Sequence, residues 1–522
     1  KNFATLAEAI ADTLLIDGDL VIIGDRENAE FNVVLAASVT IDTHGVIQCT
    51  GVGTLALDIV LKPTMSTVNF GAVTTAAVNN TAAIQAAVDT RRKIYHDIVS
   101  EASGPIEMSN NYHLAGTGTI LKKGSISYVA SDTNTYDPLI VFKTGQTKIV
   151  LEGITCADGD QNVTTKVSSA DCVLFEFGFR NKLLNLKIDN FNYGVRNSDS
   201  DMFLLTLEGV VINSCEYGFD FANSASAKTT FTFKNCYANN CGTGYNFNNF
   251  QYSVLDTCAA DYIADKDASN PIDGVGRGSR AATTGVFHFQ NCSAISVNGC
   301  GTESSYGNGG IHQNASTVAV NGLRIYLLKS TYLPIYASVP EYYVGPIMSG
   351  SEAGVGGGFT IDGLSMLSAW ENNVATASKQ AVIVNNHNNG AYGIPSGIII
   401  NANVSDDATM GTAAKAVGGA GYVNNVRLTG AKNTLNSGSR LVFTPIVIAA
   451  ASLGTVLSIP FLSQGSNNRV SVVSIQTLSN TYNTTTPLVG TADIECTSLT
   501  TLNATIVNSG GNVASVSSPG LA

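Results

Sequence analysis

Alternating apolar and polar residues recur in three successive pieces between residues 183 and 247: LLNLKIDNFNYGV, LEGVVINSCEYGFDF and FKNCYANNCGTGYNF. Each piece combines an alternating run, a corner rich in Asn, Ser or Cys, a glycine and a second short apolar run. The glycines, Gly194, Gly218 and Gly244, are 24 and 26 residues apart. Alternation with a period of two is typical of β-strands, and a repeat of this length indicates a solenoid of stacked coils. The pieces are too short for pairs of helices, so the pattern predicts a parallel β-helix.

The strand pattern extends to both sides of these coils. Strand-like runs recur from residue 106 onward, and further runs begin at Val254 and Val286. Between the latter two, residues 265–285 are rich in Gly, Ser and charge and have no strand pattern. Loops that leave a rigid solenoid commonly form the walls of binding sites. We therefore expect a β-helix over residues 67–430, with a long loop at residues 265–285.

The regions flanking the repeats predict three further elements. Residues 1–66 contain short strand-like runs separated by Gly and Asp, which favours a small β-rich domain. Near residues 80–90, Asn80 as N-cap and an apolar face around Ile84 predict a helix that covers the open end of the solenoid. Residues 431–522 are nearly uncharged and contain several strand-like runs, which favours a β-sandwich-like cap or trimerisation domain.

Composition narrows the class of protein. Hydrophobic residues make up 44% and charged residues only 13%, with 51 glycines, as in an all-β protein with many turns. With a net charge of −12, the chain lacks the basic surface that nucleic-acid binding requires. The uncharged run at residues 441–462 is long enough to cross a membrane, but Pro445, Gly454 and Pro460 favour two buried strands joined by a turn. We expect neither a nucleic-acid partner nor membrane insertion.

Cysteine and histidine spacing predicts no metal site. The chain has 10 cysteines but no C-x-x-C pair, and its histidines form neither an H-E-x-x-H motif nor a close cluster. Nucleotide-binding and nucleophile-elbow fingerprints are also missing, so no cofactor is predicted. Cys236, Cys258 and Cys292 each follow a similar corner residue, and we expect free, buried thiols stacked as a ladder.

The residues FGA at 70–72, followed by NTAAIQAA at 80–87, resemble the opening signature of the pectate-lyase-like β-helix superfamily, which is common at the front of bacteriophage tailspike depolymerases. The resemblance covers residues 1–430. It implies an all-β, right-handed, single-stranded parallel β-helix that assembles into a homotrimer on the virion tail. It also implies binding and cleavage of a bacterial surface polysaccharide, capsular or exopolysaccharide. Because the sequence begins at Lys1 without Met, we expect attachment to the virion through a segment that it does not include.

Hydrolysis of a glycosidic bond requires two carboxyl groups, one to protonate the leaving oxygen and one to activate water or attack the sugar. Aligning the CGTE run that ends at Glu303 with the CGTG run that ends at Gly244 places an acid where earlier coils have glycine. We therefore predict Glu303 as general acid. Asp261 is the preferred base or nucleophile, with Asp256 and Asp273 as alternatives.

Aromatic rings stack on sugars, and guanidinium groups bind sugar carboxylates in a bidentate manner. The predicted substrate-binding residues are Tyr245, Tyr262, Tyr306, Arg277, Arg280 and His288. Three functions remain open: an endo-acting glycoside hydrolase, a polysaccharide lyase on the same scaffold, and a non-catalytic receptor-binding spike. The acids and aromatic residues gathered between residues 256 and 306 favour the hydrolase.

Overall fold

The structure, a computed structural model, describes residues 1–263 and 286–328 with short gaps, and only separate strands beyond residue 328. The gaps are residues 43, 76, 109, 111, 161–168, 199–200, 223–226, 304–310 and 315. The chain divides into two compact units. Unit 1 contains residues 1–287 and 294–306, and unit 2 contains residues 288–293 and 307–522.

Unit 1 begins with a five-stranded sheet in the order β1-β2-β3-β5-β4. Its strands are β1 (Asn2–Phe3), β2 (Leu20–Ile23), β3 (Ala29–Leu35), β4 (Val46–Gln48) and β5 (Leu55–Ile59). Helix α1 (Leu6–Ala11) starts at a capping box formed by Thr5 and Glu8. Alternate residues of β2 and β3, such as Val21 and Phe31, are fully buried and form a small core.

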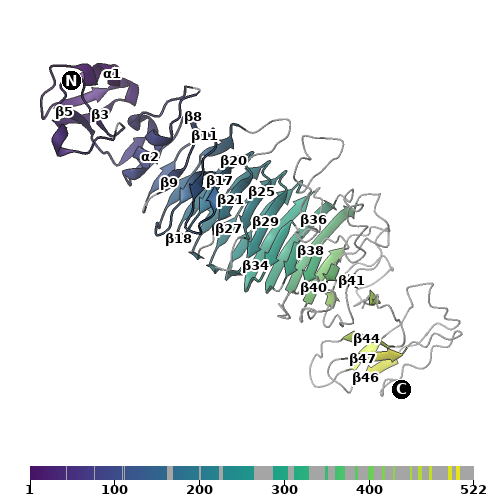
Figure 1. Cartoon of the computed structure of the whole chain (residues 1–522). Coiled ribbons are helices and arrows are strands. Elements are labelled where there is room, and N and C mark those ends of the chain that lie inside the picture. The colour runs from purple at the N-terminus through teal and green to yellow at the C-terminus, as the bar shows by residue number, and fades with distance from the viewer. Residues whose placement is uncertain are drawn as a thin grey trace. The chain divides into compact units, whose positions relative to one another are not determined.

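Helix α2 (Thr81–Asp89) lies where the β-helix begins and packs against β9 (Ile106–Met108), as Figure 1 shows. Its buried residues include Ile84, Ala87 and Val88, as the apolar spacing requires. Gln85 exchanges hydrogen bonds with the backbone of Glu107 at 2.7 and 3.0 Å. The capping helix predicted near residues 80–90 is confirmed.

Asn80 precedes α2, but its side chain does not cap the helix. The side chain is 2% exposed and instead accepts a hydrogen bond from the Val73 backbone and donates to the carbonyls of Val73, Val78 and Glu101. Asn79 caps the helix instead: its Oδ1 accepts a hydrogen bond from the Thr81 backbone N–H at 3.0 Å. Asn80 therefore joins the loop before α2 to the first coils.

Substituting Asn80 should destabilise this end of the chain more than substituting its neighbour. Asn80→Ala removes the hydrogen bonds of a side chain that is 2% exposed, at a cost of about 2 kcal/mol. Asn79→Ala removes the cap and exposed hydrogen bonds to Ser103, together worth about 1 kcal/mol. Thermal unfolding followed by circular dichroism should show the larger drop in midpoint for Asn80→Ala. Equal midpoints for the two variants would contradict the assigned role of Asn80.

Beyond α2, unit 1 consists of stacked coils held together by parallel sheets, as Figure 1 shows for the strands from β9 to β34. In one sheet, which we name the double sheet, each coil contributes two consecutive strands. The first track of the double sheet is β6 (Thr64–Ser66), β7 (Lys93–Tyr95), β10 (His113–Ala115), β15 (Val150–Glu152), β19 (Lys182–Leu184), β23 (Thr206–Glu208), β27 (Thr232–Lys234) and β31 (Val254–Asp256). The second track is β8 (Val99–Ala102), β11 (Thr119–Lys122), β16 (Thr155–Asp158), β20 (Lys187–Asp189), β24 (Val211–Asn213), β28 (Tyr237–Asn239) and β32 (Ala259–Asp261). Strand β34 (Ile295–Glu303) pairs with both β31 and β32.

Two further sheets complete each coil. The aromatic sheet, named for the rings packed inside it, contains β9, β14 (Pro138–Phe142), β17 (Asp171–Phe175), β21 (Tyr193–Asn197), β25 (Tyr217–Phe221) and β29 (Thr243–Asn248). The short sheet contains β18 (Gly178–Phe179), β22 (Met202–Phe203), β26 (Lys228–Thr229) and β30 (Phe250–Gln251). An antiparallel hairpin, β12 (Tyr128–Val129) and β13 (Thr135–Tyr136), also belongs to unit 1. These long parallel sheets confirm the predicted β-helix in unit 1.

Three residues with positive φ recur at equivalent corners of successive regular coils. Asparagine tolerates this left-handed conformation better than most residues, which explains the Asn-rich corners of the repeat. In four successive coils the three residues are Arg180, Asn185, Asn190; Leu204, Gly209, Ser214; Thr230, Asn235, Asn240; and Tyr252, Thr257, Tyr262. The coil therefore has three corners of similar local chemistry.

The glycines of the three aligned coils stack as the repeat predicts. A Cβ at Gly194 would lie 2.7 Å from the Ile212 side chain, and one at Gly218 would lie 2.7 Å from the carbonyl oxygen of Gly244. At Gly244 the added Cβ would lie 2.8 Å from the carbonyl oxygen of Val286. Close approach inside the coil, rather than a special φ, requires glycine at these positions.

The interior contains free cysteines and stacked rings. All nine cysteines that the structure describes are free and buried. The register stacks Cys236, Cys258 and Cys300, so the predicted thiol ladder exists, but Cys300 rather than Cys292 completes it. Cys292 occupies another corner of the coil, which resembles the first in sequence.

Unit 2 also contains parallel ladders. One consists of β36 (Val318–Leu328), β38 (Phe359–Trp370), β40 (Ile398–Val404) and β42 (Arg427–Thr429). The other consists of β35 (Ile311–Asn314), β37 (Ile347–Gly350), β39 (Val382–Asn385), β41 (Ala414–Val417) and β43 (Val447–Ile448). Two antiparallel pairs follow: β44 (Val456–Pro460) with β47 (Thr501–Thr505), and β45 (Arg469–Val472) with β46 (Ala492–Glu495). The rest of the predicted C-terminal domain at residues 431–522 lies outside the described residues.

Candidate functional site

Asp261 and Glu303 are direct neighbours on the outer face of the double sheet. They pair in register at the ends of β32 and β34, on adjacent parallel strands. The Glu303 backbone N–H donates to Asp261 Oδ1 at 2.7 Å. Asp261 is half-buried and Glu303 is exposed. The structure therefore brings together the two carboxyl groups that the sequence analysis favoured.

The alignment that singled out Glu303 is nevertheless wrong. Val286, and not Glu303, contributes the backbone that faces Gly244. Glu303 instead belongs to a column of polar residues, one per coil, on the second track of the double sheet: Asp189, Asn213, Asn239, Asp261 and Glu303. The earlier members are linked by hydrogen bonds, from Asn213 to Asp189 at 2.8 Å and from Asn239 to Asn213 at 3.3 Å. Glu303 thus replaces an amide or a shorter acid, not a glycine.

Tyr237 orients Asp261. Its hydroxyl donates to Asp261 Oδ2 at 2.8 Å, while the other oxygen of Asp261 accepts the Glu303 backbone. Burial, together with the hydrogen bond and negative charge of Asp261, raises the pKa of Tyr237 above its ordinary value. The phenol therefore remains a donor throughout the neutral and mildly alkaline range. Two donors, one on each oxygen, fix the orientation of the Asp261 carboxyl group, as a base or nucleophile requires.

The remaining predicted acids are placed differently. Asp256 is half-buried on β31, in register with Lys234 and Asn298 on the first track of the double sheet. The left-handed corner at Thr257 separates it from Asp261, so it does not neighbour Glu303. Asp273 lies outside the described residues, as do the predicted sugar-binding residues Tyr306, Arg277 and Arg280.

Two of the predicted sugar-binding residues are buried, which corrects their assignment. Tyr245 is 0% exposed, and its ring stacks between Phe219 and Phe287 at centroid distances of 4.7 and 4.9 Å. His288 is only 7% exposed, so it does not line an open groove as expected from its alternation with phenylalanines. Tyr262 is 42% exposed at the corner that follows Asp261.

The sequence analysis missed a second cluster on the outer face of the aromatic sheet. We name it the tyrosine–arginine stack: Tyr136, Arg196, Tyr193 and Tyr217. The Arg196 guanidinium carbon lies 3.7 Å from the ring centroid of Tyr193 and 4.8 Å from that of Tyr136. Tyr193 and Tyr217 stack at 4.0 Å. The Tyr-Gly dipeptides at residues 193 and 217 recur at one position of consecutive coils, a signal that could have revealed this cluster.

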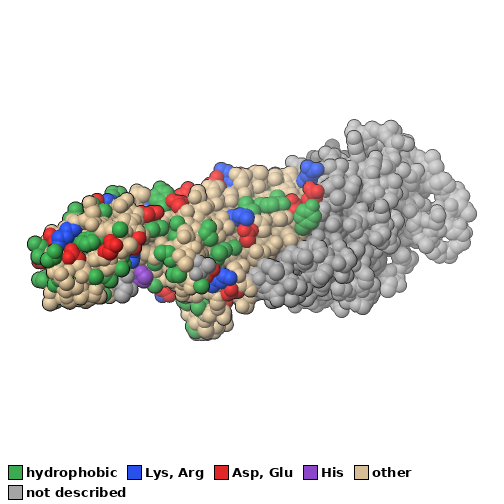
Figure 2. All heavy atoms as spheres, turned by 90° about the horizontal axis from the view of Figure 1, so that it is seen from above, with side chains coloured by type: hydrophobic (Ala, Val, Ile, Leu, Met, Phe, Trp, Pro, Cys, Tyr) green, Lys and Arg blue, Asp and Glu red, His purple; other side chains and the backbone are tan. Residues whose placement is uncertain are grey.

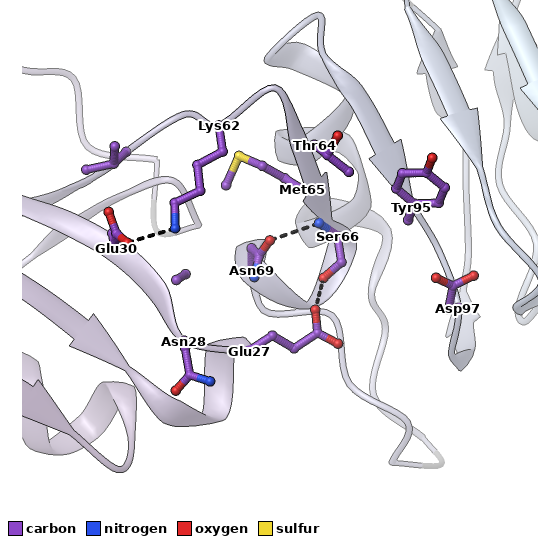
Figure 3. Close-up of a pocket in the computed structure, with 12 residues that line it drawn as sticks. Glu27, Asn28, Glu30, Lys62, Thr64, Met65, Ser66, Asn69, Tyr95 and Asp97 are labelled. Carbon is purple, nitrogen blue, oxygen red and sulfur yellow. Dashed lines mark hydrogen bonds and ion pairs between the residues drawn. The ribbon is translucent and has the colours of Figure 1, made fainter.

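A cleft of about 340 Å³ lies in unit 1 between the N-terminal sheet and the first coil (Figure 3). Its charged walls are paired: Lys62 Nζ lies 2.8 Å from Glu30 Oε1, and Ser66 donates to Glu27. Figure 3 shows these pairs spanning the joint, with Asp97 on the β-helix side. The contacts in this cleft connect the small sheet to the β-helix, and they do not form a pair of neighbouring carboxyl groups like Asp261 and Glu303.

In the part of the chain that the structure describes, His, Cys, Asp and Glu side chains nowhere form a group of three or more suited to holding a metal ion. No helix among the same residues has the length and apolar character needed to cross a membrane.

Comparison at the sequence level finds no family model that matches the chain and no curated protein that resembles it. Solved structures do match. The gp42 tailspike of Acinetobacter phage vb_AbaP_AS12 has a TM-score of 0.59 at 15% identity, over 92% of this chain and 81% of that chain. The enzymatically active domain of tailspike protein 2 from bacteriophage CBA120 has a TM-score of 0.54 at 16% identity, over 77% of this chain but only 57% of that chain. The chain shares the parallel β-helix fold of these phage tailspikes.

Proposed function

We propose that this chain is a phage tailspike that binds a bacterial surface polysaccharide and cleaves its internal glycosidic bonds by hydrolysis. The observation that carries the proposal is the in-register pair Asp261–Glu303 on the outer face of a β-helix. Figure 2 shows charged side chains of both signs scattered among hydrophobic side chains, other side chains and backbone on the face that it draws. Such a surface suits a hydroxyl-rich polymer better than a polyanion.

In the proposed reaction, Glu303 is the general acid and Asp261 the nucleophile. The backbones of in-register residues on adjacent parallel strands are about 4.8 Å apart, which lets two carboxyl groups come as near as the roughly 5–5.5 Å of retaining glycosidases. We therefore expect retention at the anomeric carbon. A bound glycan would lie against the exposed Glu303 side chain, which would donate the proton that the leaving oxygen requires. Tyr262, at the neighbouring corner, would stack on a sugar ring.

The direct test is incubation of the purified chain with a panel of bacterial capsular polysaccharides, followed by size-exclusion chromatography. Hydrolysis shortens the polymer and creates reducing ends without ultraviolet absorbance. An absorbing, unsaturated product would instead indicate a lyase. Retention of a polysaccharide without shortening would indicate a receptor-binding spike. Either of the last two results would overturn the hydrolase.

Tyr237→Phe should slow the reaction while leaving the fold intact. The variant removes one of two donors to the Asp261 carboxylate, and a hydrogen bond to a charged group is worth about 1.5–3 kcal/mol. We expect a loss of about tenfold or more in rate, because the carboxylate loses a hydrogen bond that orients it. A parental rate in this variant would exclude Asp261 from the reaction.

The proposal extends to assembly. A tailspike of this kind would be a homotrimer on the virion tail, built of a small N-terminal domain at residues 1–66, a right-handed β-helix at 67–430 and a β-sandwich-like cap at 431–522. The fold shared with phage tailspikes supports this arrangement, and the mass of the purified chain by light scattering tests the trimer.

A further inference from the structure

Three cations that no acid neutralises lie together on the β-helix of unit 1. We name them the basic patch: Lys148, Arg180 and Lys182. All three residues are exposed, and no ion pair joins any of them to an acid within the described part of the chain. Unpaired cations are unusual in this β-helix, as the other lysines and arginines show.

Every other lysine or arginine that the structure describes between β9 and β34 is held by a partner. Lys228 is buried and donates to the backbone carbonyl of Asn248. The remaining cations have carboxylate partners at 2.8 to 3.5 Å: Lys122 with Asp137, Lys123 with Asp160, Lys143 with Glu107, Lys187 with Asp189, Arg196 with Asp171 and Lys234 with Glu208. The three unpaired cations of this region are therefore also neighbours of one another.

The register of the coils brings the basic patch together. Val150 pairs with Lys182, so counting back two residues aligns Lys148 with Arg180 at one corner of successive coils. Both corner residues have a φ of 57°, and the backbone N–H of Lys148 donates to the carbonyl of Phe179 at 3.0 Å. In-register backbones are about 4.8 Å apart, so these long side chains can meet at one anion.

The corner that carries the basic patch is fixed from inside. Asn181 is fully buried, and its Oδ1 accepts a hydrogen bond from the Ile149 backbone N–H at 3.0 Å. The Ile149 carbonyl accepts in turn from the backbone N–H of Lys182 at 2.8 Å. The guanidinium carbon of Arg180 lies 5.2 Å from the ring centroid of Phe179, which orients it. A fixed corner lowers the ordering cost of binding a ligand.

The acids on the strands beside β19 do not neutralise the basic patch. Glu152 lies on β15 and is bonded to His113 at 2.7 Å, and Glu208 lies on β23 and pairs with Lys234 at 3.1 Å. Like charges held this close repel one another unless an anion lies between them. A guanidinium binds a carboxylate in a bidentate manner, and a lysine adds a point charge. A carboxylate of the ligand would therefore complete the basic patch.

The charge of the whole chain limits how acidic that ligand is. The chain has 28 basic and 40 acidic residues and a net charge of −12. A densely charged polyanion would be repelled by the chain as a whole, whereas an isolated carboxylate on a neutral polymer needs only one local patch. The basic patch thus suits a polysaccharide whose acidic sugars are separated by neutral ones.

The basic patch and the candidate catalytic pair lie on the same sheet. Lys182 begins β19 on the first track of the double sheet, and three strand steps through β23 and β27 lead to β31. Three steps correspond to about 14 Å along the stack of coils. Asp261 lies on the next strand of the coil that contains β31, so a polymer held at the patch can extend to the carboxyl pair.

We propose that the basic patch binds a uronic-acid carboxylate of the polysaccharide and so selects polymers that carry isolated acidic sugars. This inference rests on the proposed function, because the ligand is the polymer that the chain cleaves. Arg180 contacts the carboxylate, and Lys148 and Lys182 add charge beside it. Asn181 and Phe179 are positioning residues. Fixing one acidic sugar at the patch also sets which bond of the polymer lies at the catalytic pair.

The test uses the full chain carrying Glu303→Gln, to limit cleavage, and immobilised bacterial capsular polysaccharides with one uronic acid per repeat. The patch variant combines Lys148→Gln, Arg180→Gln and Lys182→Gln. It should weaken retention about tenfold or more at low salt, and the difference from the parent should vanish near about 1 M salt, where charges are screened.

The matched control combines Lys123→Gln, Lys143→Gln and Lys234→Gln. It removes the same charge from three surface lysines that have carboxylate partners, and it should change retention less than twofold. Chemical reduction of the uronate carboxyl groups to alcohols gives a neutral polymer with the same linkages. The parent should retain this reduced polymer about tenfold more weakly or less, and the patch variant should retain both forms equally.

Several results would overturn the basic patch as a glycan site. These are retention within twofold of the parent by the patch variant, an equal loss in the control, undiminished retention of the reduced polymer, or no retention of any uronate polymer by the parent. A smaller oligomer of the patch variant in light scattering would instead assign the patch to contacts with a second copy. Circular dichroism of each variant separates lost binding from lost folding.

The two proposals fail separately. If the chain that keeps Glu303 shortens a polymer whose retention does not depend on the basic patch, only the patch is wrong. If retention depends on the patch but that chain never shortens the polymer, only the proposed hydrolysis is wrong.

Discussion

Glu303→Gln should lower the rate of polysaccharide depolymerisation by about 10²–10⁴-fold, the range expected when a general acid is removed. The amide keeps the size and the backbone hydrogen bond of Glu303 to Asp261, because that bond uses the main-chain N–H. Binding of the polymer and thermal unfolding should therefore remain close to those of the parent. Release of reducing ends at saturating polysaccharide, compared with retention of the uncleaved polymer, measures the two effects separately.

Glu208→Gln is the matched control for this variant. Glu208 lies on the same face of the double sheet, at the end of β23, and its carboxylate pairs with Lys234 at 3.1 Å. A surface ion pair of this kind contributes about 0–1 kcal/mol, so the control should cleave at the parental rate. Parental activity of Glu303→Gln, or equal losses in both variants, would remove Glu303 from the mechanism.

The repeat allowed much of unit 1 to be predicted. Alternation located the strands, the polar corners marked the turns, which the structure shows to be left-handed, and the three aligned glycines stack against one another. Each of these features is a local backbone requirement repeated once per coil, so one sequence is enough to reveal it. The helix around Ile84 could also be predicted, because its apolar face follows the 3.6-residue period.

The position of Glu303 within the coil could not be obtained in the same way. A coil has three corners with similar chemistry, and the CGT run recurs at two of them: before Gly244 on the aromatic sheet and before Glu303 on the double sheet. Matching these runs shifted the alignment by one corner. Only the register, which depends on backbone hydrogen bonds between distant residues, shows that Glu303 belongs to the column of Asp261.

The sequence analysis also did not predict which tyrosine side chains point into the core and which point outward. Tyr217 precedes Gly218, the recurring glycine of its coil, and is half-buried on the outer face. Tyr245 follows the equivalent Gly244 and is fully buried. Amino-acid composition alone does not distinguish these two tyrosines. A tyrosine before the glycine points outward and one after it points into the core, so only the first can contact a sugar. The sequence analysis did not use that distinction.

Tyr245→Ala should consequently disrupt folding rather than sugar binding. The substitution removes a fully buried ring that stacks on Phe219 and Phe287, and such a cavity costs about 3–5 kcal/mol. Tyr245→Phe keeps the ring and loses only the hydroxyl, which donates to the Cys236 carbonyl at 2.8 Å. That carbonyl also accepts from the Ala259 backbone, so it stays satisfied, and the cost should be about 1 kcal/mol.

Thermal unfolding and polysaccharide retention together test this assignment. We expect a large drop in the unfolding midpoint for Tyr245→Ala, a small one for Tyr245→Phe, and parental retention of the polymer by folded Tyr245→Phe. Tyr262→Ala provides the contrast: its ring is 42% exposed beside Asp261, so its loss should weaken retention with little change in midpoint. If Tyr245→Phe lost retention while its midpoint stayed parental, the hydroxyl of Tyr245 would have to reach the glycan, and its assignment to the core would fail.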